Sequence, residues 1–199
     1  MKELLIAVPT LDMMHFKFVE SLTQLSQALH ENGVTHDISF EYGTLLYIQR
    51  DKLGNRAIEN GYKKVLWIDS DMVFKPDVYD ILTECDKPVV AGVFRSRHIG
   101  NSSCLFSNLQ NVTRIDEFPE KPFEIKGCGF GCVLTDTGVL ERVKDNYGSL
   151  FRPTALYGED LAFCARCYDL DIEIWADGRA KIGHVMQSIL WPDKTTEGF

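Results

Sequence analysis

The stretch Val65-Leu66-Trp67-Ile68-Asp69-Ser70-Asp71-Met72-Val73 decides the fold, because a short apolar run ends abruptly in two aspartates. An apolar run of this length predicts a strand that is buried on both faces of a sheet. Open α/β sheets bind ligands at the carboxyl ends of such strands. In an extended chain the side chains of Asp69 and Asp71 point the same way, so we expect two carboxylates to converge there.

Two converging carboxylates suit a hard divalent cation, and such a cation suits a substrate that carries phosphate. The alternative is a solvated turn after a core strand, because Asp and Ser are common turn residues. This segment alone leaves both interpretations open.

The composition is that of an ordinary globular protein of 199 residues, of which 45% are hydrophobic and 25% are charged. The length predicts a single domain over residues 1–199 with a sizeable core. The formal net charge of -8 disfavours nucleic acid and anionic membrane surfaces as partners. A protein this acidic is expected to need a metal ion to hold substrate phosphates.

Residues 1–10 contain an apolar run of only about six residues, which is too short for a signal-peptide core or a membrane span. We therefore expect a cytosolic (cytoplasmic) protein without a transmembrane segment. The six cysteines are expected to be reduced thiols. Cys164-Ala165-Arg166-Cys167 has the spacing of a zinc-ligand pair, but it lies in a helical pattern, where cysteines usually fill the core.

Strands and helices alternate along the first half of the chain, which predicts an α/β fold with a mostly parallel central sheet flanked by helices. The expected strands are Glu3–Val8, His36–Phe40, Lys64–Ile68 and Pro88–Phe94. The expected helices are Phe16–His30, Asp51–Asn60 and Pro76–Cys85. From Gly100 to Pro122, polar residues and short β-like runs predict a small antiparallel region within the same domain.

The segment Lys126–Leu134 is rich in glycine but fits neither the P-loop nor the dinucleotide fingerprint. Close approach of its backbone to a ligand or to another strand is one explanation, and a structural bulge is the other.

Gly158-Glu159-Asp160 precedes a helical pattern from Leu161 to Leu170. The dipole and free amides of a helix N-terminus favour ionised acids, so a carboxylate there is a candidate general base. The alternative is an N-cap followed by a first-turn acid. Beyond an expected strand at Ile172–Trp175, His184 follows a short apolar element, where a structural role is the alternative.

The Asp-x-Asp motif at 69–71, the Gly-Glu-Asp motif at 158–160 and the His184 segment resemble, in order and separation, the GT-A family of nucleotide-sugar-dependent glycosyltransferases. The large inverting group of that family is the most similar. Ala7-Val8-Pro9-Thr10 resembles its first strand and nucleotide-contacting loop, and Arg50 with Asn55-Arg56-Ala57 resembles the helix before its Asp-x-Asp strand. The resemblance covers most of the chain.

The resemblance implies that residues 1–99 bind a nucleotide sugar and that residues 100–199 form the acceptor side. It implies donor contacts from Pro9, Thr10, Arg50, Asn55, Asp69 and Ser70, and metal ligands among Asp69, Asp71 and His184. Asp160 would be the general base, with Glu159 holding the acceptor. Mixed carboxylate and imidazole ligands suit Mn²⁺, with Mg²⁺ as the alternative. The implied reaction moves a sugar from a UDP- or GDP-sugar to a hydroxyl acceptor, such as a glycan, with inversion.

Three other classes share parts of this pattern. A haloacid-dehalogenase-like phosphatase would use Asp69 as a nucleophile, but it also needs a downstream lysine and an acid pair whose spacing Gly158-Glu159-Asp160 lacks. A sugar-nucleotide pyrophosphorylase is expected to carry a glycine- and lysine-rich phosphate loop, whereas Pro9–Phe16 has no glycine. A non-catalytic carbohydrate-binding module would not need a metal set and a base together.

Overall fold

A seven-stranded sheet forms the centre of the computed structural model, which describes residues 2–97, 102–186, 188–190 and 196–198. The strand order is β2-β1-β3-β10-β5-β11-β8. In chain order the strands are β1 (Lys2–Thr10), β2 (His36–Tyr42), β3 (Tyr62–Ile68), β5 (Val89–Val93), β8 (Pro122–Ile125), β10 (Cys132–Asp136) and β11 (Ile174–Lys181).

Most strands of this sheet run in one direction. β1 is parallel to both β2 and β3, and β11 is parallel to β5. β10 runs antiparallel between β3 and β5, with Cys132 opposite Ile68, and β8 runs antiparallel to β11 at the edge. The predicted mostly parallel α/β sheet is therefore confirmed.

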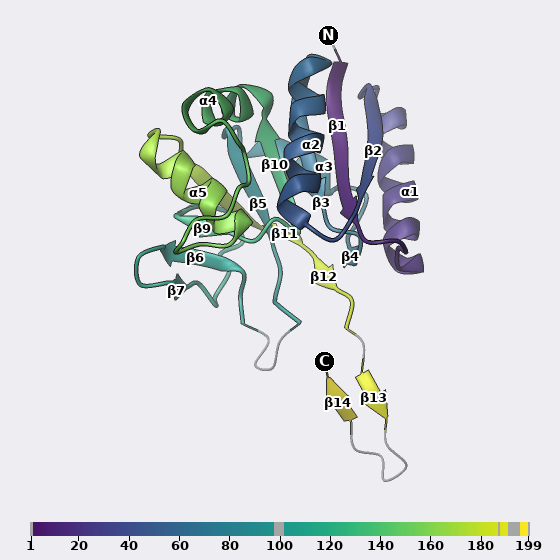
Figure 1. Ribbon diagram of the computed structural model, residues 1–199. Coiled ribbons are helices and arrows are strands. Elements are labelled where there is room, and N and C mark those ends of the chain that lie inside the picture. Colours follow the sequence, from purple (N-terminus) through teal and green to yellow (C-terminus); the bar gives the residue numbers. More distant parts are fainter. Residues whose placement is uncertain (1, 98–101, 187, 191–195, 199) are drawn as a thin grey trace.

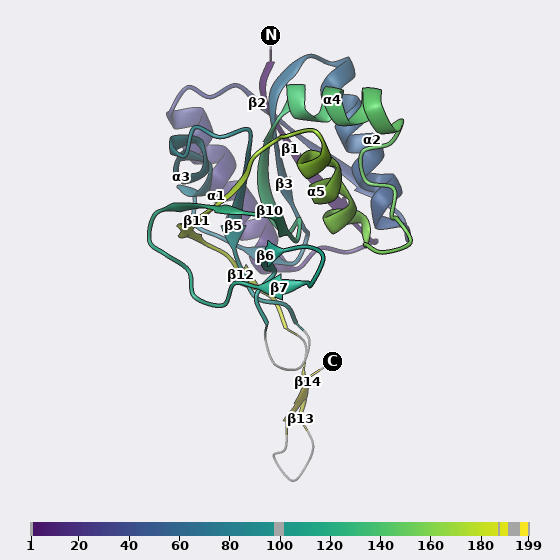
Figure 2. The same cartoon turned by 90° about the vertical axis from the view of Figure 1, so that its left-hand side faces the viewer.

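Five helices cover the two faces of the sheet in the described part of the chain (Figure 2). On one face lie α1 (Phe16–Glu31) and α3 (Val78–Glu84). On the other face lie α2 (Leu46–Glu59), α4 (Thr137–Tyr147) and α5 (Glu159–Asp169). None of the helices among the described residues combines the length and apolar composition needed to cross a bilayer.

Alternation of side chains along the strands divides the core into two layers. On β1, Leu4 and Ile6 pack in the layer that includes the buried leucines of α1, whereas Leu5 and Ala7 pack in the layer beneath α2, α4 and α5. On β3, Trp67 belongs to this second layer, together with three phenylalanines: Phe130, Phe151 and Phe163. Both layers are apolar, which explains why the central strands read as continuous hydrophobic runs.

Small antiparallel sheets complete the fold (Figure 1), and the first of them contains strands from the region predicted to be antiparallel, residues 100–122. One contains β6 (Leu105–Asn108), β7 (Thr113–Arg114) and β9 (Gly127–Cys128). A second pairs β4 (Met72–Val73) with β12 (Gly183–His184). A third pairs β13 (Ser188–Leu190) with β14 (Thr196–Gly198), beyond β12 and away from the main sheet in both views.

Two helices differ from the sequence-based expectation. α2 begins at Leu46, before the expected start at Asp51, and its N-cap residue Leu45 makes no side-chain capping hydrogen bond that would mark the start in the sequence. α4 was not predicted, although Val139, Leu140 and Val143 recur at helical spacing and are buried.

The expected boundary between the two halves, between residues 99 and 100, falls within residues 98–101, outside the described part of the chain. Strands from both halves share the main sheet, because β10 lies between β3 and β5. The functional division into a donor half and an acceptor half stays a prediction.

Candidate functional site

A cleft of about 590 Å³ lies at the carboxyl ends of β1 and β3. Three chain segments form most of its wall: residues 9–15 after β1, residues 43–49 around the start of α2, and the turn at 69–71. Five residues predicted from the sequence line it: Pro9, Thr10, Asp69, Ser70 and Asp71. The structure thus brings most of the expected donor-side residues to one place.

The residues after β3 form a turn instead of continuing as extended chain. Met72 N–H donates to the Asp69 carbonyl at 3.1 Å, and Asp69 N–H donates to the Gly131 carbonyl at 3.1 Å. The expected extended backbone is therefore replaced by a turn, although both carboxylates line the same cleft. Asp69 and Asp71 contact different partners, which form two clusters.

The Arg50 cluster consists of Arg50, Asp69 and Glu159. Arg50 Nη2 donates to Asp69 Oδ1 and Arg50 Nη1 donates to Glu159 Oε1, each at 2.9 Å. The arginine side chain is only 2% exposed, and its guanidinium lies 5.5 Å from the ring centre of Phe130 and 5.9 Å from that of Phe151. This cluster ties α2, the turn after β3 and the start of α5 together.

Burial raises the pKa of Asp69, and the nearby carboxylates Asp71 and Glu159 add to the rise, whereas Arg50 opposes it. Arg50 was expected to contact the nucleotide sugar. In the structure its two terminal nitrogens are paired with the carboxylates of Asp69 and Glu159. Arg50 itself does not line the cleft, whereas its partner Asp69 does.

The His184 cluster consists of Asp71, His184 and Arg97. Pairing of β12 with β4 sets His184 opposite Met72, and Val185 N–H donates to the Asp71 carbonyl at 3.0 Å. His184 Nε2 consequently lies 3.5 Å from Asp71 Oδ2, and Arg97 Nη1 lies 2.9 Å from the same oxygen. Residues far apart in the sequence therefore meet at one carboxylate.

Two opposing effects act on the ionisation of each member of the Asp71–His184 pair. Burial opposes the charge on Asp71, but the hydrogen bond and charge of His184, together with Arg97, outweigh it and lower the pKa of Asp71. Burial likewise opposes the charge on His184, but Asp71 and the Arg95 carbonyl outweigh it and raise the pKa of His184. The ion pair is favoured in the absence of any other cation.

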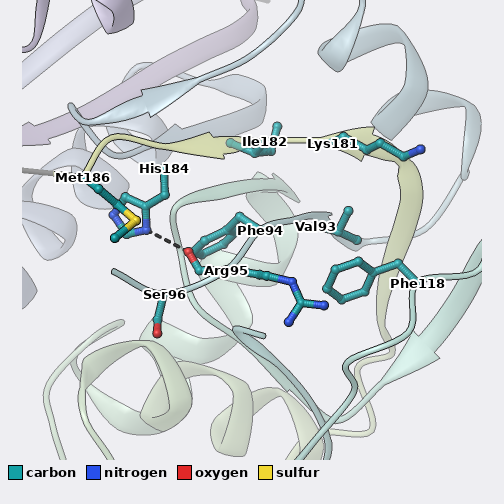
Figure 3. Close-up of a pocket in the computed structure, with 9 residues that line it drawn as sticks. All are labelled: Val93, Phe94, Arg95, Ser96, Phe118, Lys181, Ile182, His184 and Met186. Carbon is teal, nitrogen blue, oxygen red and sulfur yellow. Dashed lines mark hydrogen bonds between the residues drawn. The ribbon is translucent and has the colours of Figure 1, made fainter. Parts of the chain in front are cut away.

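Two contacts on the side of the ring that faces away from Asp71 orient the imidazole of His184 (Figure 3). Its Nδ1 lies 3.0 Å from the Arg95 carbonyl, and its ring meets Phe94 edge-on with centres 5.9 Å apart. With Nδ1 donating to that carbonyl, the charged imidazole also donates from Nε2 toward Asp71, and the neutral form would offer the Nε2 lone pair to a metal. Behind the ring is a second hollow of about 350 Å³, with apolar walls that include Val93, Phe118 and Ile182.

Asp160 lies at the start of α5, next to the Arg50 cluster. Its Oδ1 accepts a hydrogen bond from Leu161 N–H at 2.7 Å. Burial and the neighbouring charge of Glu159 nevertheless raise the pKa of Asp160. The Leu161 amide lowers the pKa of Asp160, as expected at a helix N-terminus, but desolvation and the adjacent acid outweigh it. A raised pKa brings a carboxylate closer to the range in which it works as a general base.

The glycines before β10 pack against the same region. A Cβ at Gly131 would lie 2.4 Å from the Met72 side chain and 2.8 Å from Phe94, and one at Gly129 would lie 3.1 Å from Phe94. Close approach to neighbouring elements, one of the two explanations given for this segment, therefore accounts for these glycines.

The residues present fit a divalent cation with two protein ligands. Asp71 Oδ2 and His184 Nε2 are a carboxylate and an imidazole donor on adjoining elements, and divalent cations at such sites commonly take further oxygens from substrate phosphates and water. Among the described residues, no group of three or more His, Cys, Asp or Glu side chains could hold a metal ion. Asp69 lines the same cleft, but one of its oxygens, Oδ1, is paired with Arg50.

The remaining candidates lie elsewhere. Asn55 is five residues beyond Arg50 on α2, a rotation of about 140° around the helix, and it lines a separate hollow with Glu41 and Lys52.

The sequence interpretation missed Arg97, although it follows β5 and so lies at the same edge of the sheet. All six cysteines are free thiols, and Cys164 and Cys167 are buried in α5.

The mostly parallel sheet, with antiparallel β10 between β3 and β5, has a GT-A-like fold. No protein-family model and no curated protein sequence matches the chain. Similarity to solved structures supports the fold.

A197 from STIV aligns with a TM-score of 0.67 and 18% identity, over 98% of this chain and 93% of that one. The inositol-1-phosphate CTP transferase from T. maritima aligns with a TM-score of 0.52 and 11% identity, over 92% and 89%. A mutant of Drosophila β-1,4-galactosyltransferase 7, in complex with manganese, UDP-Gal and xylobiose, aligns at 0.49 with 13% identity, over 93% and 71%. The alignments with A197 and with the CTP transferase establish the fold, and at these identities they do not establish an activity.

Proposed function

We propose that the protein is a metal-dependent glycosyltransferase that moves a sugar from a nucleoside diphosphate donor, a UDP- or GDP-sugar, to a hydroxyl acceptor. The observation that carries the proposal is the pairing of Asp71 with His184, 3.5 Å apart, beside a cleft at the carboxyl end of β3. A carboxylate and an imidazole at that position suit Mn²⁺, or alternatively Mg²⁺, and a cleft of this size accommodates a nucleotide.

The donor is proposed to bind with its nucleotide along Pro9, Thr10 and Ser70. Mn²⁺ held by Asp71 and His184 would supply stabilisation of the negative charge that develops on the diphosphate as the sugar bond breaks. Asp69 contacts the donor ribose or a metal-bound water, and Arg50 acts by holding Asp69. Asn55 is left out of the donor site because it lies outside the cleft.

Asp160 is the proposed general base. It takes the proton of the acceptor hydroxyl as that oxygen attacks the anomeric carbon from the face opposite the leaving diphosphate, so the configuration inverts. General-base assistance of this kind contributes roughly 10²- to 10⁴-fold to the rate. Glu159, held by Arg50, orients the acceptor, for which a glycan is one class. Inversion and a cytosolic location stay predictions.

A phosphatase that uses Asp69 as nucleophile is the second candidate. Such a phosphatase also needs an acid pair whose spacing Gly158-Glu159-Asp160 lacks. We therefore rank this activity below glycosyl transfer.

Thermal shift with UDP and GDP, each with and without Mn²⁺, tests the donor site, because a ligand that binds only the folded state raises its apparent stability. Mn²⁺-dependent release of UDP or GDP from the corresponding hexose donors then separates a transferase from a carbohydrate-binding module. Release of inorganic phosphate from p-nitrophenyl phosphate with no release of nucleotide would favour the phosphatase and contradict the proposal.

A further inference from the structure

We propose that Arg97 is an exchangeable cation. It forms an ion pair with Asp71 when the cleft is empty, and when a divalent cation binds Asp71, Arg97 pairs with the donor diphosphate instead. This inference rests on the proposed function, since it requires a metal and a diphosphate in the same cleft. It assigns a donor-binding role to a residue that the sequence motifs do not include.

The first argument is that Arg97 is paired with the carboxylate oxygen that a metal would use. Arg97 Nη1 is 2.9 Å from Asp71 Oδ2, the same atom that faces His184 Nε2 at 3.5 Å. A guanidinium stays protonated and has no lone pair to offer a metal. A divalent cation shared by Asp71 and His184 would therefore repel Arg97 from that oxygen.

The second argument concerns charge in the cleft. Three aspartates line it, Asp12, Asp69 and Asp71, and among the described lining residues Arg97 supplies the only lysine or arginine charge. A nucleoside diphosphate brings further negative charge into this acidic wall. One divalent cation together with a released Arg97 would offset that charge, and guanidinium groups match phosphate oxygens well.

The third argument is the difference in exposure between the two arginines that contact the Asp-x-Asp turn. Arg50 is 2% exposed and is held by two carboxylates, so it is not free to move to a ligand. The Arg97 side chain is 53% exposed and contacts Asp71 at the cleft surface. Exposed ion pairs contribute little net stability, so this pair breaks readily when a stronger partner arrives.

The test is isothermal titration of the full chain, with wild type, Arg97→Ala and the control Arg152→Ala, an exposed arginine that does not line the cleft. The first titration uses Mn²⁺ alone. The second uses UDP and GDP at saturating Mn²⁺. We expect Arg97→Ala to bind Mn²⁺ about 3- to 10-fold more tightly, because a competing cation is gone, and to bind the nucleotide about 10-fold more weakly. Arg152→Ala should match wild type in both titrations.

The opposite signs of the two changes distinguish exchange from a structural role. If Arg97→Ala weakens both ligands, or leaves either affinity unchanged while wild type binds both, the exchange role is overturned and the glycosyltransferase proposal stands. If wild type binds neither Mn²⁺ nor nucleotide, both proposals are overturned. Melting temperatures of the three proteins within about 2 °C of one another would show that folding is not the cause.

Discussion

The Arg50 cluster and the His184 cluster both pair an arginine with an aspartate of the same short turn, yet they differ in burial. Arg50 is enclosed by Asp69, Glu159 and two phenylalanine rings, whereas Arg97 meets Asp71 at the wall of the cleft. A buried ion pair is costly to break, because a charge is left without a partner, whereas an exposed one exchanges readily. An arginine–aspartate pair thus holds three elements together in the Arg50 cluster, whereas in the His184 cluster it is an exchangeable contact.

The largest effect is expected at Asp71. Asp71→Ala removes the carboxylate shared by His184 and Arg97, so transfer should fall by about 10³-fold or more, and Mn²⁺-dependent nucleotide binding should be lost. The protein should stay folded, because this carboxylate lies at the surface of the cleft. Activity assays and calorimetry measure both effects, and circular dichroism checks the fold. Unimpaired turnover would contradict the glycosyltransferase proposal.

Loss of Arg50 tests the contribution of the Arg50 cluster to stability. Arg50→Met keeps apolar contact with Phe130 and Phe151 but leaves Asp69 and Glu159 without their cation, so the free energy of unfolding should fall by about 3 kcal/mol. Arg97→Met is the matched control and should change it by less than about 0.5 kcal/mol. Urea titration measures both variants. Equal losses would remove the distinction between the two clusters.

Asp160 and Glu159 are adjacent but should respond differently. Asp160→Asn should lower kcat by about 10²-fold while metal and donor binding stay near wild type. Because burial raises the pKa of Asp160, the kcat of the wild type should fall as pH decreases, at a higher pH than for an ordinary carboxylate. Steady-state kinetics with donor and acceptor varied separately measure this.

Glu159→Gln should raise the acceptor KM, and it should also reduce stability, because Glu159 contacts Arg50. Product analysis reports the stereochemistry. A product with retained configuration, or wild-type turnover in Asp160→Asn, would remove Asp160 from the base role.

The smallest effect is the pH dependence of the Asp71–His184 pair. The pKa of His184 is raised from 6.5, so its contribution is complete below pH 6.5 and is lost as pH rises through the raised value. The pKa of Asp71 is lowered from 3.8, so its contribution is complete above pH 3.8 and is lost as pH falls through the lowered value. The pair should therefore stabilise most between these two limits.

The measurement is the free energy of unfolding of wild type minus that of His184→Gln, as a function of pH without metal. We expect a plateau of up to about 1 kcal/mol at mildly acidic pH, which declines above it. A difference that grows toward alkaline pH would show that His184 is not paired with Asp71 in its charged form.

The sequence predicted those features that depend on local pattern. Apolar runs predicted the strands of the parallel core, and the position of Asp69 and Asp71 after one of them predicted the edge at which the cleft lies. The pairing of Arg50 with Asp69 and Glu159 could not be predicted, because it joins residues on three elements whose relative positions only the packed sheet fixes. The raised pKa of Asp160 was missed for a related reason, since burial is a property of the fold and not of the Gly-Glu-Asp motif.

The antiparallel course of β10 has a consequence for how this edge of the sheet is built. In an all-parallel sheet, only segments that leave a strand reach the carboxyl edge. β10 begins at that edge, with Cys132 opposite Ile68, so the segment that enters it lies beside the segments that leave β3 and β5, where Gly131 approaches Met72 and Phe94. Substitutions ahead of β10 thus act directly on the Asp-x-Asp turn, because the Gly131 carbonyl accepts a hydrogen bond from Asp69 N–H.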